Sequence, residues 1–207
     1  MNLHPRNFYN PVKQKQRRYD KIVSLLRLKP TDTVLNVGCG EGLTFETFNN
    51  TNPITGVDLF KEGKIHRKDF KYVQITGKGE LPFKDKEFDA VVCIGVLEHV
   101  KPFEALQKTC NEIERVGKKF LILVPDYNTL IEPHYAFPFF QHLPIPIQKW
   151  LHKMLNLRLE LDKRRENPYE EINYYPTKKW LGLFKEAKYT IHKHIGILIT
   201  NLIIWKS

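Results

Sequence analysis

Three glycines at alternate positions, Gly38, Gly40 and Gly42, directly follow the largely apolar segment 34–37. Such a segment is typical of a buried strand in a parallel sheet, and a helical segment comes after the glycines. A strand that ends in glycines brings bare backbone N–H groups and a helix N-terminus up to a bound ligand, because no Cβ blocks the approach. The spacing therefore predicts a ligand site lined by the backbone.

Asp58 is the second residue that indicates chemistry, because it ends the segment 53–58 about twenty residues after the glycines. A carboxylate at the end of a second strand can accept hydrogen bonds from both hydroxyls of a ribose. A dinucleotide site would have a third glycine where this chain has Leu43. The glycines and Asp58 together predict a cofactor that contains a nucleoside, and Leu43 disfavours a nicotinamide dinucleotide.

Four sequence blocks, in this order, carry a family resemblance: VLNVGCGEG at 34–42, GVDLF at 56–60, LPFKDKEFDAVVCIGVLEHV at 81–100 and ERVGKKFLILVPD at 114–126. With these blocks the chain resembles class I S-adenosylmethionine-dependent methyltransferases of the Rossmann-like, methyltransferase type 11 group, which includes quinone-biosynthesis methyltransferases. The resemblance is good over residues 18–126 and looser at the C-terminal end. It implies S-adenosylmethionine as the cofactor.

The resemblance also implies which residues bind that cofactor: the glycines hold its methionine part and Asp58 its ribose. Two positions depart from the family pattern, since Asn36 replaces the usual acid and Gly77 stands where an adenine-binding aspartate is common. The amide of Asn36 keeps a hydrogen bond but loses attraction to an α-ammonium group. Backbone groups of residues 78–81 are an alternative contact for adenine, against a turn with no ligand role. The implied cofactor residues are Asn36, Gly38, Cys39, Gly40, Gly42, Asp58, Leu59, Lys78, Gly79, Glu80, Leu81, Cys93, Ile94 and Gly95.

Two histidines are candidate general bases. His99 follows the expected strand 88–94, at the edge where a doubly wound sheet binds ligands, and a neutral imidazole can accept a proton near pH 7. His134 lies early in the segment rich in aromatics and proline that begins at residue 127. The alternatives are a capping or packing role for His99 and a surface-loop position for His134. Positioning alone can also supply much of the rate of methyl transfer.

The elements that must position these residues alternate between strand and helix. This alternation predicts an α/β fold with a doubly wound, mostly parallel seven-stranded sheet, right-handed crossovers and an antiparallel C-terminal hairpin at one edge. Apolar periodicity and turn residues predict strands at 33–37, 54–58, 72–75, 88–94, 119–124, 189–195 and 197–205, helices at 13–29, 42–50, 102–116 (closed by Gly117) and 177–187, and a helix or loop at 60–69.

The chain is expected to form one domain, 1–207, which divides into a cofactor-binding core at 13–126, an insert at 127–170 and a C-terminal helix and hairpin at 171–207. The division treats the insert as a substrate lid. Two other interpretations are open: a cap helix packed on the core, and docking on a membrane surface. All three rest on an apolar stripe at helical spacing, formed by Ile147, Trp150, Leu151, Met154 and Leu155.

The net charge of +10 lies at the two ends of the chain. Residues 1–30 hold eight Lys or Arg and one acid, and residues 172–207 hold six and one. A basic end can attract nucleic acid, an anionic membrane or an acidic substrate, while a solvated lysine-rich surface is the plainer interpretation. No apolar run reaches the roughly 18 residues of a membrane span, and no secretory signal is recognised, so a cytoplasmic location is expected. The three cysteines lack metal-ligand spacing, and no metal site is predicted.

Three functions are compatible with these patterns. The leading one is an S-adenosylmethionine-dependent methyltransferase of a small molecule, and the aromatic insert favours a hydrophobic or lipid-linked acceptor. The basic N-terminal end encourages a nucleic-acid methyltransferase. That reading lacks support elsewhere, because no Asn/Asp-Pro-Pro-aromatic motif follows the strand 88–94 and no Pro-Cys pair offers a nucleophile for cytosine. Asn36 and Gly77 give weight to a non-catalytic protein that binds the cofactor.

Overall fold

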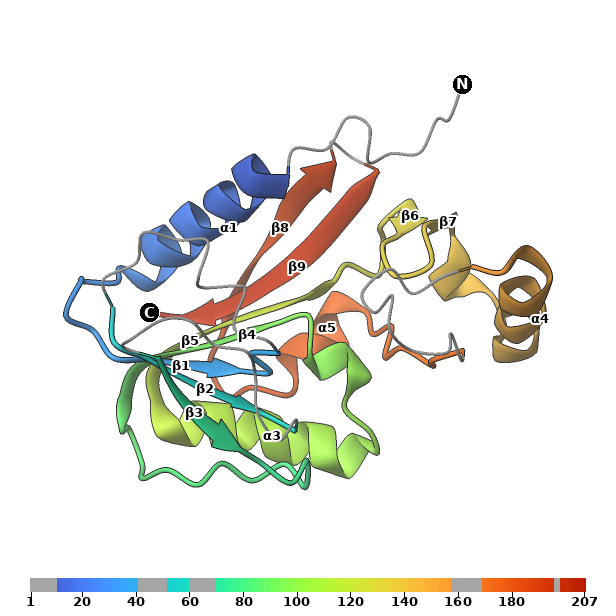
Figure 1. Cartoon of the computed structure of the whole chain (residues 1–207). Coiled ribbons are helices and arrows are strands. Elements are labelled where there is room, and N and C mark those ends of the chain that lie inside the picture. The colour runs from blue at the N-terminus through green and yellow to red at the C-terminus, as the bar shows by residue number, and fades with distance from the viewer. Residues whose placement is uncertain (1–10, 41–51, 60–69, 158–168, 196–197) are drawn as a thin grey trace.

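A computed structural model describes residues 11–40, 52–59, 70–157, 169–195 and 198–207, and seven strands in these ranges form one sheet in the order β3-β2-β1-β4-β5-β9-β8 (Figure 1). The first five strands along the chain run parallel, and β9 is antiparallel to both β5 and β8. The predicted fold class is therefore confirmed. The strands are β1 (Val34–Val37), β2 (Ile54–Asp58), β3 (Phe70–Gln74), β4 (Phe88–Ile94), β5 (Gly117–Pro125), β8 (Lys188–Ile195) and β9 (Ile199–Lys206).

The strand order reverses at β1, which lies between β2 and β4. Val34 pairs in register with Ile54 on one side and with Ala90 on the other. All four residues of β1 are buried, as expected for a parallel strand covered on both faces. Ligands of doubly wound sheets bind outside the carboxyl ends of the strands at such a switch point. The turn after β1 and the loop after β4 thus lie at the edge where a ligand is expected.

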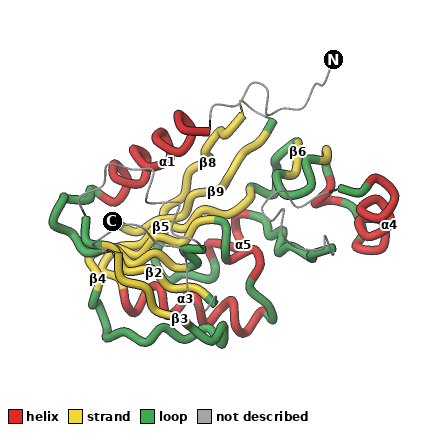
Figure 2. The backbone as a smooth tube through the Cα atoms, viewed as in Figure 1, coloured by secondary structure: helices red, strands yellow, loops and turns green. Residues whose placement is uncertain are grey.

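Helices cover both faces of the sheet (Figures 1 and 2). On one face lies α1 (Pro11–Leu26), whose Ile22 and Leu26 are buried in a cluster with side chains of β1, β2, β4, β5 and β9. On the other face lie α3 (Phe103–Val116) and α5 (Thr177–Leu181). In α3 the buried apolar side chains recur every three or four residues, which is the pattern of a helix with one face on a core. Each such side chain contributes about 1.5–3 kcal/mol on burial.

Some predicted boundaries differ from the structure, and glycine explains two of them. The helix expected at 177–187 ends at Leu181, because Gly182 is a poor helix former and the chain continues in tighter turns that bond Leu183 to Trp180. Gly117 does close α3, but in extended backbone as the first residue of β5. Its need for glycine comes from packing, since a Cβ there would lie 2.5 Å from Val91 Cγ2.

The insert forms a small unit of its own rather than a cap on the main core. It contains the strand pair β6 (Ile131–Glu132) and β7 (Phe137–Pro138), the short turn η3 (Phe140–His142) and the helix α4 (Ile145–Leu155). A separate cluster around Tyr135, Phe140 and Ile172 holds it together. Figure 1 shows α4 extending away from the sheet, and Gln148 is its one buried residue. The interpretation of α4 as a cap helix packed on the core is therefore wrong.

The predicted helix 42–50 and the predicted helix or loop 60–69 lie outside the described residues. Within the described ranges, no helix combines the length and the apolar character needed to cross a bilayer. The three cysteines are free and buried.

Candidate active site

Gly38 and Gly40, in the turn after β1, adopt the positive φ angles that glycine tolerates, but the predicted bare N–H groups are bonded within the protein: those of Gly38 and Cys39 to Val57, and that of Gly40 to Asp58. Gly38 has φ +74°, its N–H donates to the Val57 carbonyl at 2.8 Å, and a Cβ on it would lie 2.2 Å from Val96 Cγ2. Gly40 has φ +54°, and none of the residues that the structure describes lies within 4 Å of the place where its Cβ would be. The first glycine is thus required by packing against the loop after β4, whereas the second faces open space that a ligand can fill. Gly42 lies outside the described residues.

Asp58, at the carboxyl end of β2, is tied to the glycine turn. Its Oδ2 accepts the N–H of Gly40 at 2.7 Å and its Oδ1 accepts the N–H of Leu59 at 2.6 Å. A carboxylate has about four acceptor positions, so the capacity to bind two ribose hydroxyls is left over. Beyond it, Leu59 is 56% exposed and lines a hollow of about 500 Å³ together with residues 74–76. This arrangement fits the nucleoside end of a cofactor.

Asn36, the residue that departs from the family pattern, is buried in β1 two positions before the glycine turn. It is 2% exposed, and its Nδ2 has no hydrogen-bond acceptor among the residues that the structure describes. An unpaired buried donor is costly unless a ligand or water satisfies it. A donor of this kind beside an open backbone cradle suits a ligand that carries a carboxylate, as an amino acid does.

The loop implied as the adenine contact, residues 77–81, is held mainly by α3. Glu80 forms an ion pair with Lys108 at 2.6 Å, and the N–H of Leu81 donates to Glu112 at 3.0 Å. Leu81 itself is part of the core, at 5% exposed. A Cβ on Gly79 would lie 2.9 Å from the Ala105 carbonyl, so this residue is also committed to packing. Lys78 is exposed. A Cβ on Gly77, the residue before it, would lie 2.9 Å from Leu59 Cδ2.

The three implied cofactor residues at the end of β4 differ in burial. The Cys93 side chain is fully buried in the core, and burial, followed by the nearby charge of Glu98, raises the pKa of its thiol well above the usual range. Cys93 is thus an inert core thiol, and any contact it makes with a ligand must come from its backbone. Ile94 is half-buried, and the N–H of Gly95 donates to the Leu123 carbonyl at 2.9 Å. The backbone of these two residues forms the sheet edge next to the glycine turn.

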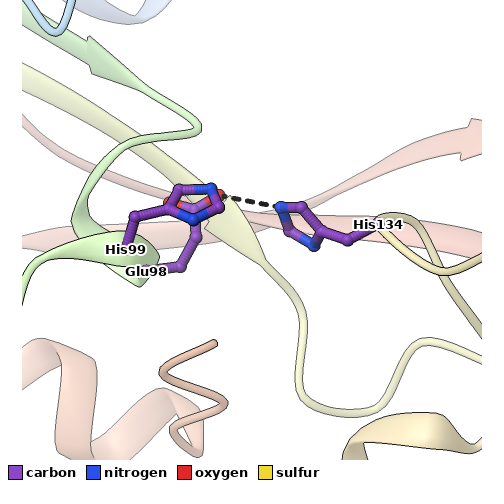
Figure 3. A group of neighbouring side chains, drawn as sticks. All are labelled: Glu98, His99 and His134. Atoms are coloured by element: carbon purple, nitrogen blue, oxygen red, sulfur yellow. Dashed lines mark ion pairs between the residues drawn. The ribbon is translucent and has the colours of Figure 1, made fainter. Parts of the chain in front are cut away.

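The structure brings together the two histidines that the sequence analysis proposed as bases. His99 ends the short turn η2 (Leu97–His99) after β4, and His134 comes from the insert. Their ring centroids lie 5.2 Å apart, and His134 Nε2 lies 3.8 Å from Glu98 Oε1 (Figure 3). Glu98 is 1% exposed and His134 8%. We call Glu98, His99 and His134 the histidine cluster.

Two carboxylates that the sequence analysis missed hold the rings in place. Nδ1 of His134 donates to Glu132 at 2.6 Å, and Nδ1 of His99 lies 2.8 Å from Glu170. Glu132 is fully buried, and its second oxygen accepts the N–H of Tyr135 at 2.6 Å. Glu132 ends β6 and His134 lies in the turn that follows, so the only usable signal was that the two residues are close in the sequence. Nothing in the sequence indicated Glu170, because it lies 71 positions from His99 and meets it only in the folded chain.

The charges around His134 favour a proton-accepting imidazole. Burial works to lower the pKa of His134, but the hydrogen bond to Glu132 and the charges of Glu132 and Glu98 outweigh it and raise the pKa. Burial raises the pKa of Glu98, against the attraction of the two histidines. The pKa of Glu170 is lowered, first by its hydrogen bond to His99. The cluster can therefore hold a proton or a cation beside the end of β4.

A parallel sheet with its switch point at β1, a glycine turn, a carboxylate after β2 and an antiparallel C-terminal pair define the class I, Rossmann-like fold of S-adenosylmethionine-dependent methyltransferases. Residues 35–122 match the family described as "Methyltransferase domain". The match covers 88 of the chain's 207 residues and shows that this part of the chain is similar to that family. The resemblance drawn from the four sequence blocks is confirmed.

Two known proteins are similar to parts of this chain. An uncharacterized protein of Methanocaldococcus jannaschii is 32% identical over 62% of this chain and 60% of its own length. The ubiquinone biosynthesis O-methyltransferase of Pseudomonas entomophila is 30% identical over 47% of this chain and 44% of its own. The alignments thus span less than two thirds of each relative's length.

One solved structure shows the same fold. The 1,6-didemethyltoxoflavin-N1-methyltransferase of Burkholderia thailandensis, with bound 1,6-didemethyltoxoflavin and S-adenosylhomocysteine, superposes with a TM-score of 0.61. The superposition covers 97% of this chain and 80% of that one, at 14% sequence identity. At this identity the likeness concerns the fold alone.

Proposed function

We propose that the protein transfers the methyl group of S-adenosylmethionine to a hydroxyl of a small, largely apolar molecule. The observation that carries this proposal is the open cradle at Gly40, tied to Asp58 and lying on the same sheet edge as a buried pair of histidines. The bound cofactor supplies an electrophilic methyl group on a positively charged sulfur. The chain's own residues then need to hold the two reactants and manage one proton.

The cofactor side of the site is assigned to β1, β2 and the turn between β1 and the following segment. The unpaired amide of Asn36 is suited to the amino-acid part, for which the glycine turn leaves room. Asp58 is suited to the ribose, and the hollow beside Leu59 to the base. Asn36, one of the two departures from the family pattern, does not prevent this assignment, because its amide leaves a donor at the site.

The acceptor side is assigned to the histidine cluster and the insert. Because Nδ1 of each ring is bonded to a carboxylate, each Nε2 is left as a proton acceptor. A hydroxyl nucleophile that loses its proton to such an atom becomes reactive toward the methyl group. The name of the Pseudomonas entomophila relative, an O-methyltransferase, supports oxygen as the methylated atom.

The apolar nature of the acceptor is inferred from the insert, which we propose acts as a lid. Its aromatic cluster begins at Tyr135, directly after His134, and Leu151 of α4 packs against that cluster. The same helix leaves the side chains of Trp150 and Met154 exposed, at 56% and 59% of their surface. A helix that leaves such side chains uncovered is suited to contact an apolar substrate.

Calorimetry with S-adenosylhomocysteine tests the cofactor assignment. The parent protein is expected to bind it, and Asp58→Ala is expected to weaken binding at least tenfold while circular dichroism stays unchanged. The control is Asp85→Asn, which removes an exposed carboxylate that pairs with Arg115, and it should bind like the parent. Absence of binding heat with the parent at millimolar ligand would contradict the proposed function.

Mass spectrometry of a cell extract incubated with the protein and deuteromethyl-labelled cofactor tests the acceptor. We expect label in an apolar small-molecule fraction. Label in RNA would overturn the acceptor class in favour of a nucleic-acid methyltransferase. Binding of the cofactor without any labelled product would indicate a non-catalytic binding protein.

A further inference from the structure

The histidine cluster combines residue types that bind metal ions. Glu98, His99 and His134 each offer one ligand atom, and these three atoms lie within 4.8 Å of one another (Figure 3). The figure shows Glu98 and His99 side by side after β4, with the His134 ring facing them from the insert. Two imidazoles and one carboxylate are a common set of protein ligands for a divalent transition metal.

The carboxylates behind the two rings prepare the histidines as ligands. Glu132 bonds Nδ1 of His134, and Glu170 bonds Nδ1 of His99. A metal-ligating histidine usually donates its second ring N–H to a carboxylate or a carbonyl, which fixes the tautomer and makes the other nitrogen more basic. Both rings in the cluster have this partner. A pair of histidines placed only for packing does not require two such carboxylates.

Glu98 supplies an independent observation. It is 1% exposed, and its Oε2 has no hydrogen-bond partner among the residues that the structure describes. An oxygen of a buried carboxylate is rarely left unpaired, because its desolvation is expensive. The other oxygen faces His134 at 3.8 Å, which is longer than a hydrogen bond. At that distance the two groups form a loose ion pair when His134 is protonated, and a cation between the carboxylate and the rings would give Glu98 a closer partner.

We propose that Glu98, His99 and His134 bind one divalent transition-metal ion. The ligand set favours ions such as Zn²⁺ or Co²⁺ over Mg²⁺ and Ca²⁺, which prefer oxygen ligands. Typical metal bonds of about 2.1 Å place ligand atoms roughly 3 Å apart, so binding draws the three side chains together. His99, whose side chain is 22% exposed, has room to turn.

The position of this site suggests what the ion does, and this second step rests on the proposed function. A Cβ placed on Gly95 would lie 3.7 Å from Glu98 Oε1, so the cluster adjoins the sheet edge assigned to the cofactor. Three protein ligands leave coordination positions open. The oxygen of the acceptor would bind there, and the ion would lower the pKa of its hydroxyl so that the proton passes to solvent and the oxygen attacks the methyl group. In the metal-bound protein the imidazoles are ligands, and the ion replaces them as the group that activates the hydroxyl.

Titration with Co²⁺, followed by visible absorption and by metal analysis after dialysis, tests the site without any assay of activity. We expect one ion per chain. Glu98→Gln keeps the shape of the side chain and removes its charge, and His99→Gln changes a partly exposed ligand. Each is expected to weaken binding at least tenfold, and Glu170→Gln, which loosens His99, by a smaller factor.

The matched control is His142→Gln, because His142 is an exposed histidine of the same insert that packs on Tyr127 outside the cluster. It should bind Co²⁺ like the parent. Thermal unfolding of each variant without metal shows whether the fold is kept. The proposal is overturned if the parent binds no Co²⁺, or if a folded Glu98→Gln or His99→Gln protein binds it as tightly as the parent does.

Measuring S-adenosylhomocysteine binding in the same proteins separates the two proposals. His99→Gln is expected to lose Co²⁺ and keep S-adenosylhomocysteine, and Asp58→Ala is expected to do the reverse. Binding of Co²⁺ without the nucleoside ligand would leave the metal site standing and sink the proposed function. Binding of S-adenosylhomocysteine by a parent protein that binds no Co²⁺ would overturn the metal site and leave the proposed function standing.

Discussion

At the carboxyl ends of β1 and β2 the site is shaped by a glycine turn, whereas at the end of β4 it is lined by charged side chains. The glycine turn is held by one carboxylate, Asp58, through two N–H groups. The histidine cluster has three carboxylates and two imidazoles in and around it, of which Glu98 and Glu132 are almost fully buried. The first region depends on the space that glycine leaves, and the second on the pairing of charges.

The two regions are therefore sensitive to opposite kinds of substitution. A backbone cradle is lost when a side chain is added, because the added atoms have nowhere to go. A buried charge cluster is lost when a side chain is removed, because its partner is left without a hydrogen bond away from water. Three substitutions measure the contrast, in order of decreasing effect.

Gly38→Ala is expected to have the largest effect, a loss of roughly 4 kcal/mol in the free energy of unfolding or no folded protein at all. Its Cβ would overlap Val96, and φ +74° is unfavourable for any residue with a side chain. Gly40→Ala is the matched control, since its Cβ meets none of the described residues and the expected cost is about 1 kcal/mol from backbone strain. Urea unfolding gives both values.

The same pair of variants separates folding from ligand binding. Gly40→Ala should remain folded and bind S-adenosylhomocysteine at least tenfold more weakly, because its methyl group enters the cradle. Equal stability losses in the two variants would show that packing against Val96 is not what requires Gly38.

Glu132→Ala is the corresponding change in the charged region, and we expect it to cost about 3 kcal/mol. It leaves Nδ1 of His134 and the N–H of Tyr135 without their acceptor in a fully buried place. Glu132→Gln keeps one acceptor oxygen and should cost less than half as much. Urea denaturation followed by far-UV circular dichroism gives the two values, and a neutral effect of the alanine variant would mean that water or a rearranged side chain replaces the carboxylate.

Asp89→Asn is expected to have the smallest effect, about 1 kcal/mol, because this carboxylate is partly exposed at the opposite edge of the sheet. Hydrogen bonds from Lys118 and then from Thr33 lower the pKa of Asp89 to about 2. A lowered pKa stabilises the folded state above the ordinary pKa, and this contribution disappears as the pH falls from about 4 to 2. Unfolding at several pH values should show the parent and the variant converging in acid. A gap that widens in acid would contradict the assignment.

The fold could be predicted because its signals are local. Buried parallel strands are nearly continuous apolar runs, such as Phe88–Ile94, and each is followed by a turn of recognisable composition. The glycine turn and Asp58 were equally accessible, since glycine spacing reports on backbone geometry directly. The boundaries that differed, at Gly117 and Gly182, depend on packing against Val91 and on the weak helix propensity of glycine.

The histidine cluster could be predicted only in part, because its members meet through the fold. His99 and His134 were recognised by residue type, but nothing in the sequence brings them within 5.2 Å of each other. Glu170 reaches His99 across 71 positions of the chain. The exposure of α4 was also hidden, because its apolar stripe resembles that of a packed helix and only the structure shows that the sheet does not cover it.

The place of β9 in the sheet has a consequence for synthesis on the ribosome. This late-made strand lies between β5 and β8 and pairs with β5 over residues 201–206. Until those residues leave the exit tunnel, β5 is an unpaired, apolar edge strand that other chains can contact. A nascent chain arrested before residue 199 should therefore recruit chaperones, and release of the last strand should end that need.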